Sequence, residues 1–332
     1  ESVIVATGSS PLELPILPVD GDRILGSRHA LKVAEPPSSL CVVGGGVIGL
    51  ELATVYAGLG TAVTVVELTD QLMPGTDRDL VQVVAARLKK LGVQVMTDAR
   101  VTACDRFGNA MRLIVEKKGA PSEVLAEQVL VAAGRRPRTA GIGLDTVGVE
   151  PDARGFLFVD DRMRTRVPNV FAAGDVTGAP LLAHKAHIEG EVAAEAAAGH
   201  EASLKARFVP AVAFTDPEVA TVGLSESRAK AEGIPVLKGR FPFGALGRAL
   251  AEDAGNGHVK VLVHPQTHVL LGVGIAGVQA GEMIAEAALA VEQGVTAEAI
   301  GDIIHSHPTF AEAFQEACRA ALGRAIHVVN KV

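Results

Sequence analysis

Residues 40–51 read LCVVGGGVIGLE, and this stretch decides the fold. The apolar run at 40–43 is typical of a short buried strand, and the glycines at 44–46 and at position 49 predict a tight turn after it. Residues 50–59 continue as a helix that the next glycine ends. The stretch therefore predicts a strand that passes through a glycine turn into a helix.

A second strand and a terminal acid follow this helix. Residues 62–66 are apolar and lead to Glu67, which stands 23 positions after Gly44. That separation is close to the roughly 20 residues expected between the first glycine and the acid of a dinucleotide-binding unit. An amphipathic helix at 77–91 and a strand at 93–96 extend the pattern to βαβαβ. The region is predicted to form a parallel sheet with helices packed on it.

The glycines of this turn allow the backbone to come close to a bound cofactor and to the neighbouring strand. Without Cβ atoms at Gly44 and Gly46, backbone amides and a helix N-terminus can approach a diphosphate, and Gly49 allows the helix to pack closely on the strand. Glu67 would accept hydrogen bonds from a ribose and repel a 2′-phosphate, which favours NAD over NADP. A glycine turn that serves topology alone is the alternative, and the agreement of all these signals favours a cofactor site.

The rest of the chain divides into two patterns. Short strands at 107–116 and 124–133 extend the first layer, and a domain closes near residue 152. After residue 207, a hairpin predicted at 259–273 precedes several helices, which indicates a separate α+β unit. These helices are predicted at 281–293, 297–304 and 309–322.

Composition excludes several classes of function. The 332 residues are 48% apolar and carry a net charge of −7 without a basic patch, so we expect no nucleic-acid partner. No apolar stretch is long enough for a membrane-spanning helix. Cys41, Cys104 and Cys318 lie far apart, which argues against a disulfide scaffold and against a metal site and favours a reducing, cytoplasmic compartment.

A histidine and a glutamate near the C-terminus form the second chemical signal. His307 is followed by Pro308 and Thr309, and Glu312 stands five positions after the histidine. A histidine titrates near neutrality and can act as a base, and a carboxylate on its other ring nitrogen would fix its tautomer. However, Thr309 and Glu312 also have the spacing of a capping box, and spacing alone favours that role for Glu312.

These motifs together resemble the pyridine nucleotide disulfide oxidoreductase family. The resemblance rests on ATGS at 6–9, GGGVIGLE at 44–51, Gly-Asp at 174–175, LLAH at 181–184 and HPTFAE at 307–312. It covers nearly the whole chain, and it implies an α/β fold. A Rossmann-like NAD-binding domain would be inserted in a partial FAD-binding domain, and a C-terminal α+β dimerisation domain would follow.

The resemblance also implies the domain limits and the cofactor residues. The FAD-binding fragment would span 1–32, the NAD-binding domain 33–152, the second part of the FAD-binding domain 153–206 and the interface domain 207–332. The residues implied along FAD are Thr7, Gly8, Ser9, Asp175, Leu181, Leu182, Ala183 and His184. The residues implied along NAD are Gly44, Gly45, Gly46, Val47, Ile48, Gly49, Glu51, Glu67, Val101 and Gly134. Among the latter, Glu51 and Gly134 would lie on the nicotinamide side and Val101 beside the adenosine.

Within the family, the chain is most similar to the branch that oxidises dihydrolipoamide to lipoamide with NAD⁺ as acceptor. The resemblance reverses the order of the two interpretations of Glu312: His307 would be the catalytic base and Glu312 its orienting partner. It implies a homodimer in which His307 serves the partner subunit's flavin. It also implies docking to the dihydrolipoyl domain or E2 core of a 2-oxo acid dehydrogenase complex.

Two alternatives remain at this point. One is another flavin disulfide reductase, of the mercuric or glutathione type. His307 argues against the mercuric type, and Glu67 argues against the glutathione type. The other is a non-catalytic, dimeric nucleotide-binding module that assembles on a complex. The family's CxxxxC pair and its first GxGxxG turn do not occur in these residues. We therefore expect the sequence to be part of a longer protein, and this portion alone to be inactive.

Overall fold

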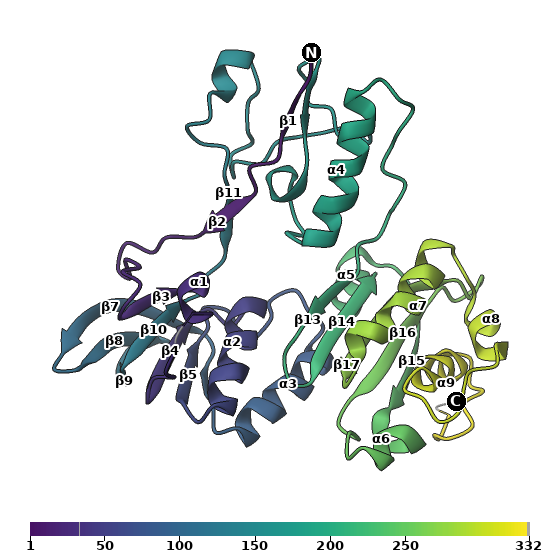
Figure 1. Cartoon of the computed structure of the whole chain (residues 1–332). Coiled ribbons are helices and arrows are strands. Elements are labelled where there is room, and N and C mark those ends of the chain that lie inside the picture. The colour runs from purple at the N-terminus through teal and green to yellow at the C-terminus, as the bar shows by residue number, and fades with distance from the viewer. Residues whose placement is uncertain (33, 331–332) are drawn as a thin grey trace. The chain divides into compact units, whose positions relative to one another are not determined.

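The computed structural model describes residues 1–32 and 34–330. The chain forms two compact units, and most of their helices and strands are labelled in Figure 1. Unit 1 combines Glu1–Leu12 with Gly134–Val209, and unit 2 combines the described residues of Glu13–Ala133 and Pro210–Val332. Both units therefore draw on segments that are distant in the sequence. Among the described residues, no helix has the length and apolar character needed to cross a bilayer.

Unit 1 contains two small pairs of strands and one long helix. Strand β1, Val3–Val5, pairs in parallel with β12, Val170–Ala172, and β2, Ser9–Pro11, pairs antiparallel with β11, Arg135–Pro137. Helix α4 packs on β1 and β12. The helical elements of this unit are α4, Ala183–Ala197, η1, Leu144–Val147, and η2, Gly174–Thr177.

The first sheet of unit 2 contains the predicted βαβαβ pattern. Its five strands are all parallel, in the order β3-β10-β4-β5-β6. Leu40, Cys41 and Val42 are almost fully buried, as expected for a central parallel strand that is covered on both faces. The strands are β3, Ile24–Gly26, β4, Ser39–Val43, β5, Ala62–Val66, β6, Gln94–Met96, and β10, Gln128–Val131.

The helices of this region confirm the sequence prediction with shifted limits. The helix after the glycine turn is α2, Val47–Gly58, which begins three residues before the predicted start. The amphipathic helix is α3, Arg78–Lys90, and a short helix α1 spans Ser27–Ala30. A separate antiparallel sheet follows, made of β7, Ala99–Phe107, β8, Ala110–Lys117, and β9, Ala120–Ala126. The prediction that a strand at 107–116 extends the first layer was therefore wrong, because β8 lies in this separate sheet, and β7 was not predicted.

The second half of unit 2 is the predicted α+β region. Its antiparallel sheet has the order β13-β14-β17-β16-β15. The predicted hairpin at 259–273 is confirmed as β16 and β17, while α9 begins at residue 312 rather than 309. The strands are β13, Ala211–Ala213, β14, Glu218–Gly223, β15, Leu237–Pro242, β16, His258–Val263, and β17, Leu270–Gly277. The helices are α5, Glu226–Glu232, α6, Gly247–Ala251, α7, Ala280–Glu292, α8, Ala297–Asp302, and α9, Glu312–Ala321, with η3 at Phe243–Ala245.

The two halves of unit 2 share a hydrophobic core. Helix α3 contacts β14 and β17, and α2 contacts β13. Leu80 of α3 belongs to the same buried cluster as Val219 and Ala276 of the antiparallel sheet. The fold class is thus a Rossmann-like domain joined to a C-terminal α+β domain. The four domain limits given above stay a prediction, and β3 adds a strand from the range 1–32 to the parallel sheet.

Candidate functional site

The glycine turn after β4 is closely packed on its inner side. Gly44 has a φ of +115°, and a Cβ there would lie 2.4 Å from the carbonyl oxygen of Ala132. A Cβ on Gly49 would lie 2.0 Å from the carbonyl oxygen of Gly44. Because neither position has room for a side chain, glycine at 44 and 49 is required for the strand, the turn and the helix to meet.

Gly46 is different, because it borders open space. It is the N-cap of α2, and a Cβ built on it would meet no atom within 4 Å. The first turn of α2, which starts with Val47 and Ile48, has no acidic residue and no capping side chain. Amides at a helix start lack partners inside the helix and favour anions. The residues present therefore fit a dinucleotide diphosphate at this turn.

Glu67 is buried beside the same turn and stabilises it. Its Oε2 accepts the amide of Gly45 at 2.7 Å, and its Oε1 accepts the amide and the hydroxyl of Thr69 at 2.8 and 2.7 Å. A carboxylate offers about four acceptor positions, so one remains for a ribose hydroxyl. The sequence pattern indicated the ribose role only. The support that Glu67 gives to Gly45 had no sequence signal.

The other predicted dinucleotide residues have differing surroundings. The Oε1 of Glu51 accepts the amide of Phe214 at 2.8 Å, so this side chain links α2 to the segment after β13. Val101 is buried in a core cluster with Leu113 and other apolar residues of unit 2. Gly134 belongs to unit 1 and has a φ of +121°. The predicted roles of all three stay predictions.

Unit 1 brings together the N-terminal residues predicted along the flavin. The hydroxyl of Ser9 donates to the carboxylate of Asp175 and accepts Nε of Arg135 at 2.7 Å. The hydroxyl of Thr7 donates to the carbonyl of Arg138 at 2.6 Å, and the carbonyl of Gly8 accepts the Arg138 amide at 2.9 Å. Thr7, Gly8, Ser9 and Asp175 therefore meet in one hydrogen-bonded region.

A buried ion pair that the sequence analysis missed supports the Gly-Asp turn. The carboxylate of Glu189 accepts the amide of Gly174 at 2.8 Å and lies 2.8 Å from Nζ of Lys185. The i, i+4 spacing of these two residues on α4 was the only available signal.

The predicted segment 181–184 leads into the same helix, α4. Leu182 is the N-cap of α4 without a capping side chain, and the first turn, with Ala183 and His184, has no acidic residue. Leu181 lies just ahead of this start, partly buried. The start of α4 can accommodate a polar ring or an anion. This set and the Ser9–Asp175 region fit the flavin that the resemblance implies.

His307 and Glu312 contact each other directly. Nδ1 of His307 lies 2.9 Å from Oε1 of Glu312, while Oε2 accepts the amide of Thr309 at 2.8 Å. The His307 side chain is 75% exposed, whereas that of Glu312 is only 20% exposed. The capping box is not formed, because α9 begins at Glu312 with Ala311 as its N-cap, and the Thr309 hydroxyl donates to the carbonyl of Ser306. The carboxylate of Glu312 thus contacts both His307 and the Thr309 amide, but it does not cap α9 as the spacing suggested.

Comparison with known families agrees with this geometry. Residues 1–190 match the family described as pyridine nucleotide-disulphide oxidoreductase. Residues 209–318 match the family's dimerisation domain. The chain belongs to the pyridine nucleotide-disulphide oxidoreductase family.

Relatives within this family share the full length of the chain. The dihydrolipoyl dehydrogenase of Geobacillus stearothermophilus is 45% identical over 331 residues, which cover 100% of this chain and 70% of the relative. The dihydrolipoyl dehydrogenase of Halobacterium salinarum is 46% identical, with 100% of this chain and 70% of the relative covered. The chain therefore spans about 70% of the length of these pyridine nucleotide-disulphide oxidoreductases.

Solved structures of family members have the same fold. LpdA from Mycobacterium tuberculosis superposes with a TM-score of 0.88 at 32% identity, over 96% of this chain and 69% of that one. The HOCl-induced flavoprotein disulfide reductase RclA from Escherichia coli gives a TM-score of 0.86 at 27% identity, over 96% and 73% of the two chains. Membership in this family of oxidoreductases implies use of a flavin and a pyridine nucleotide, and residues 209–318 are its dimerisation domain.

Proposed function

We propose that this chain supplies the NAD-binding turn, part of the FAD site and the proton-accepting pair of a dihydrolipoyl dehydrogenase. The observation that carries the proposal is the pairing of His307 with Glu312 in a dimerisation domain that follows an open glycine turn. The names of the relatives support this choice over a mercuric or glutathione reductase and over a module without catalysis.

His307 manages the substrate proton in this proposal. A thiol has an ordinary pKa near 8.5, so only a few per cent of a dithiol is thiolate at pH 7. Glu312 accepts from Nδ1 of His307, which leaves Nε2 as the nitrogen that accepts the thiol proton. The carboxylate also stabilises the imidazolium that results. When bound, FAD supplies two-electron transfer between the dithiol and the nicotinamide of NAD⁺.

The cysteines of the described chain are not suited to thiol exchange. Burial raises the pKa of Cys41 to about 12 and raises the pKa of Cys318 further, and burial also raises the pKa of Cys104. Since the thiolate is the nucleophile in exchange, these residues act as small apolar side chains. In the proposed reaction, the exchanging thiols are other than these three.

Glu67 and Gly46 support NAD as the acceptor. The start of α2 would hold the diphosphate, and the remaining acceptor position of Glu67 would bind a ribose hydroxyl. A 2′-phosphate would meet the negative charge of Glu67.

A homodimer is the proposed assembly. The dimerisation domain exposes large apolar side chains near His307, among them Ile304 with 97% and Ile303 with 49% of their surface exposed. Such exposure favours burial against a second copy. His307 would then serve the redox site of the partner subunit. Docking to the dihydrolipoyl domain or E2 core of a 2-oxo acid dehydrogenase complex follows from the proposed activity.

The test uses the complete gene product, with whatever sequence flanks these 332 residues. We expect dihydrolipoamide-dependent reduction of NAD⁺ that is lost in His307→Gln. A flavin-containing product without this activity contradicts the proposal. A preference for NADPH over NADH would instead favour a glutathione-type reductase.

A further inference from the structure

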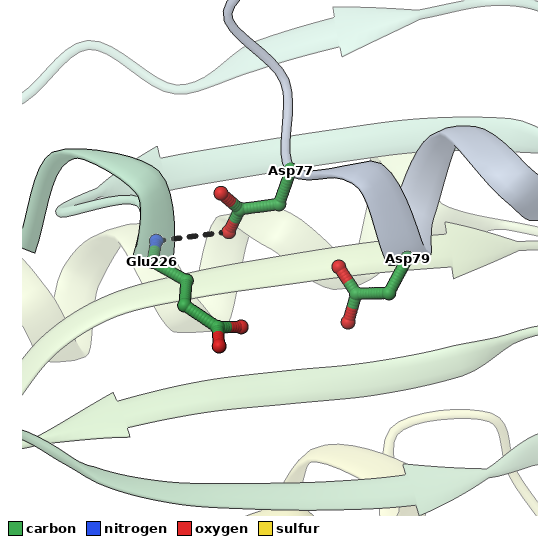
Figure 2. A group of neighbouring side chains, drawn as sticks. All are labelled: Asp77, Asp79 and Glu226. Carbon is green, nitrogen blue, oxygen red and sulfur yellow. Dashed lines mark hydrogen bonds between the residues drawn. The ribbon is translucent and has the colours of Figure 1, made fainter. Parts of the chain in front are cut away.

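A buried lysine connects the dimerisation domain to α3. Lys260 of β16 is 2% exposed, and its Nζ lies 2.8 Å from Asp77, 2.6 Å from Asp79 and 3.3 Å from Glu226. Figure 2 shows the three acidic side chains, with Asp77 at the entrance to α3 and Glu226 at the start of α5. One ammonium of the C-terminal domain thus holds two carboxylates of the dinucleotide domain.

The acids of this cluster are already partnered. Lys238 lies 2.7 Å from Glu226, and His258 lies 3.4 Å from Asp79. Asp77 also accepts the backbone amides of Glu226 and Ser227 at 2.9 and 3.0 Å, and Figure 2 shows the first of these bonds. Asp77 therefore caps the first turn of α5 in the other domain rather than that of α3. The cluster is an ionic link between domains, with Lys260 in the place a cation would take.

The link ends a loop that borders the dinucleotide turn. The loop 68–76 connects Glu67 to Asp77, and it is fixed at its start by the hydrogen bonds that Thr69 donates to Glu67. In its middle, the amide of Met73 donates to the carbonyl of Gly45 at 2.8 Å. Both backbone groups of Gly45 are therefore fixed, its amide by Glu67 and its carbonyl by Met73 of the loop.

The packing beneath this loop gives the link a rigid base. A Cβ on Gly274 of β17 would lie 2.6 Å from Leu80 of α3, so helix and sheet are in close contact. A buried ion pair with several hydrogen bonds has a defined geometry and is costly to break from one side. A substitution of Lys260 should therefore displace the end of the loop 68–76 more than it displaces the antiparallel sheet.

We propose that Lys260 is a positioning residue for dinucleotide binding. Its ammonium holds Asp77 and so fixes the end of the loop 68–76. The hydrogen bonds of Met73 and Glu67 to the backbone of Gly45 then keep Gly45 in the conformation that binds the diphosphate. The dimerisation domain thereby contributes to NAD affinity without touching the cofactor. This inference rests on the proposed NAD-binding role of the glycine turn.

The test compares Lys260→Met with Arg87→Gln in the complete gene product. Arg87 of α3 lies 2.7 Å from Asp216, so it also joins α3 to the dimerisation domain, but both side chains are about half exposed. NADH affinity is measured by calorimetric titration, and hydrogen exchange is followed at Gly45 and Met73. For Lys260→Met we expect about tenfold weaker NADH binding and faster exchange at both amides. Arg87→Gln should leave both unchanged.

The kinetic readout separates positioning from general damage. The loss in Lys260→Met should fall on KM for NAD⁺ rather than on kcat or on KM for dihydrolipoamide. Lys260→Arg, which keeps the charge, should restore most of the affinity. If Lys260→Met fails to fold, Asp77→Asn tests the same link and should weaken NADH binding in the same direction.

The outcomes distinguish this inference from the proposed function. Wild-type protein that binds NADH, together with folded Lys260 and Asp77 variants that bind it within about twofold of wild type, overturns the inference alone. Wild-type protein that neither binds NADH nor reduces NAD⁺ with dihydrolipoamide overturns the proposed function.

Discussion

Nδ1 of His307 lies 2.9 Å from Oε1 of Glu312, and this contact decides which ring nitrogen is available for chemistry. A carboxylate can only accept, so Nδ1 must carry the proton that it shares with Glu312. Nε2 is then the acceptor on a ring that is largely exposed. The pair is arranged as a base with an orienting partner.

Replacement of His307 by Gln should abolish most of the proposed activity. A positioned base contributes about 10²–10⁴-fold to such a step, and glutamine cannot take up the proton. The measurement is dihydrolipoamide-dependent NAD⁺ reduction, with NADH affinity as the control that should not change. Turnover within a few-fold of wild type would show that another group accepts the proton.

Replacement of Glu312 by Gln should have two smaller effects, because its carboxylate has two partners. Loss of the fixed His307 tautomer should lower kcat, and a weaker hydrogen bond to the Thr309 amide should cost about 1 kcal/mol of stability. Thr309→Val is the matched control, since it keeps the amide and loses only the hydroxyl bond to Ser306. Equal kcat values for the Glu312 and Thr309 variants would contradict the orienting role.

Gly46→Ala and Gly49→Ala should separate binding from folding. A Cβ at 46 meets no atom within 4 Å, so Gly46→Ala should bind NADH more weakly and lose at most about 1 kcal/mol of stability, because alanine is the poorer N-cap. A Cβ at 49 would lie 2.0 Å from the Gly44 carbonyl, so Gly49→Ala should lower the free energy of unfolding by about 1–3 kcal/mol. Thermal melting and NADH titration on the two variants check this contrast. Unchanged NADH affinity in Gly46→Ala would place the diphosphate elsewhere.

Glu67→Gln should reduce the preference for NADH over NADPH. The substitution removes the negative charge that a 2′-phosphate would meet. It also replaces one of two acceptor oxygens, of which Oε2 binds the Gly45 amide and Oε1 binds Thr69. We therefore expect a lower kcat/KM for NADH and a higher ratio of NADPH to NADH activity. The measurement is kcat/KM for NADH and for NADPH in the wild-type protein and the variant. An unchanged ratio of the two values would show that Glu67 does not determine cofactor preference.

The glycine turn could be predicted from the sequence because its signals are local. Strand β4, the turn and α2 follow one another within 20 residues, and each has its own pattern of apolar residues or glycines. Strand β7 was missed because Arg100, Asp105 and Arg106 give it the composition of a loop, and because only Ala99 and Val101 of its nine residues are buried.

The limits of sequence reasoning are clearest where one group serves two partners. Spacing presented the helix cap and the histidine partner as alternatives for Glu312, but α9 begins at Glu312 itself, and the two carboxylate oxygens contact His307 and the Thr309 amide. Lys260 and Asp77 are separated by 183 positions, and a lysine within an apolar strand pattern gives no sign of its partner. Contacts of this kind depend on how distant elements pack, which a local pattern does not contain.

The stability of the Lys260 link should depend on pH in a defined way. Burial alone would raise the pKa of Asp79, but hydrogen bonds from His258 and Lys260 hold it below its ordinary value. Burial would lower the pKa of Lys260, but the bonds to Asp77 and Asp79 raise it. A lowered carboxyl pKa gives stability above about pH 4 that is lost as the pH falls through the folded value. A raised lysine pKa gives stability below about pH 10 that is lost as the pH rises through the folded value.

Lys260→Met should therefore lower the free energy of unfolding by about 3–5 kcal/mol at pH 7, because it leaves the buried Asp77 and the partly buried Asp79 without the lysine ammonium. The deficit should shrink toward pH 3, since protonation neutralises the carboxyl groups that have lost Lys260 in the variant. In the wild-type protein the lowered pKa values of Asp77 and Asp79 keep the link ionised longer, and its contribution declines as the unfolded chain takes up protons. Urea unfolding between pH 3 and pH 9 measures this difference. Arg87→Gln is the control and should cost less than about 1 kcal/mol at any pH, since its pair with Asp216 is half exposed. A deficit for Lys260→Met that is the same at pH 3 and pH 7 would mean that Lys260 acts through the packing of its aliphatic chain rather than through its charge.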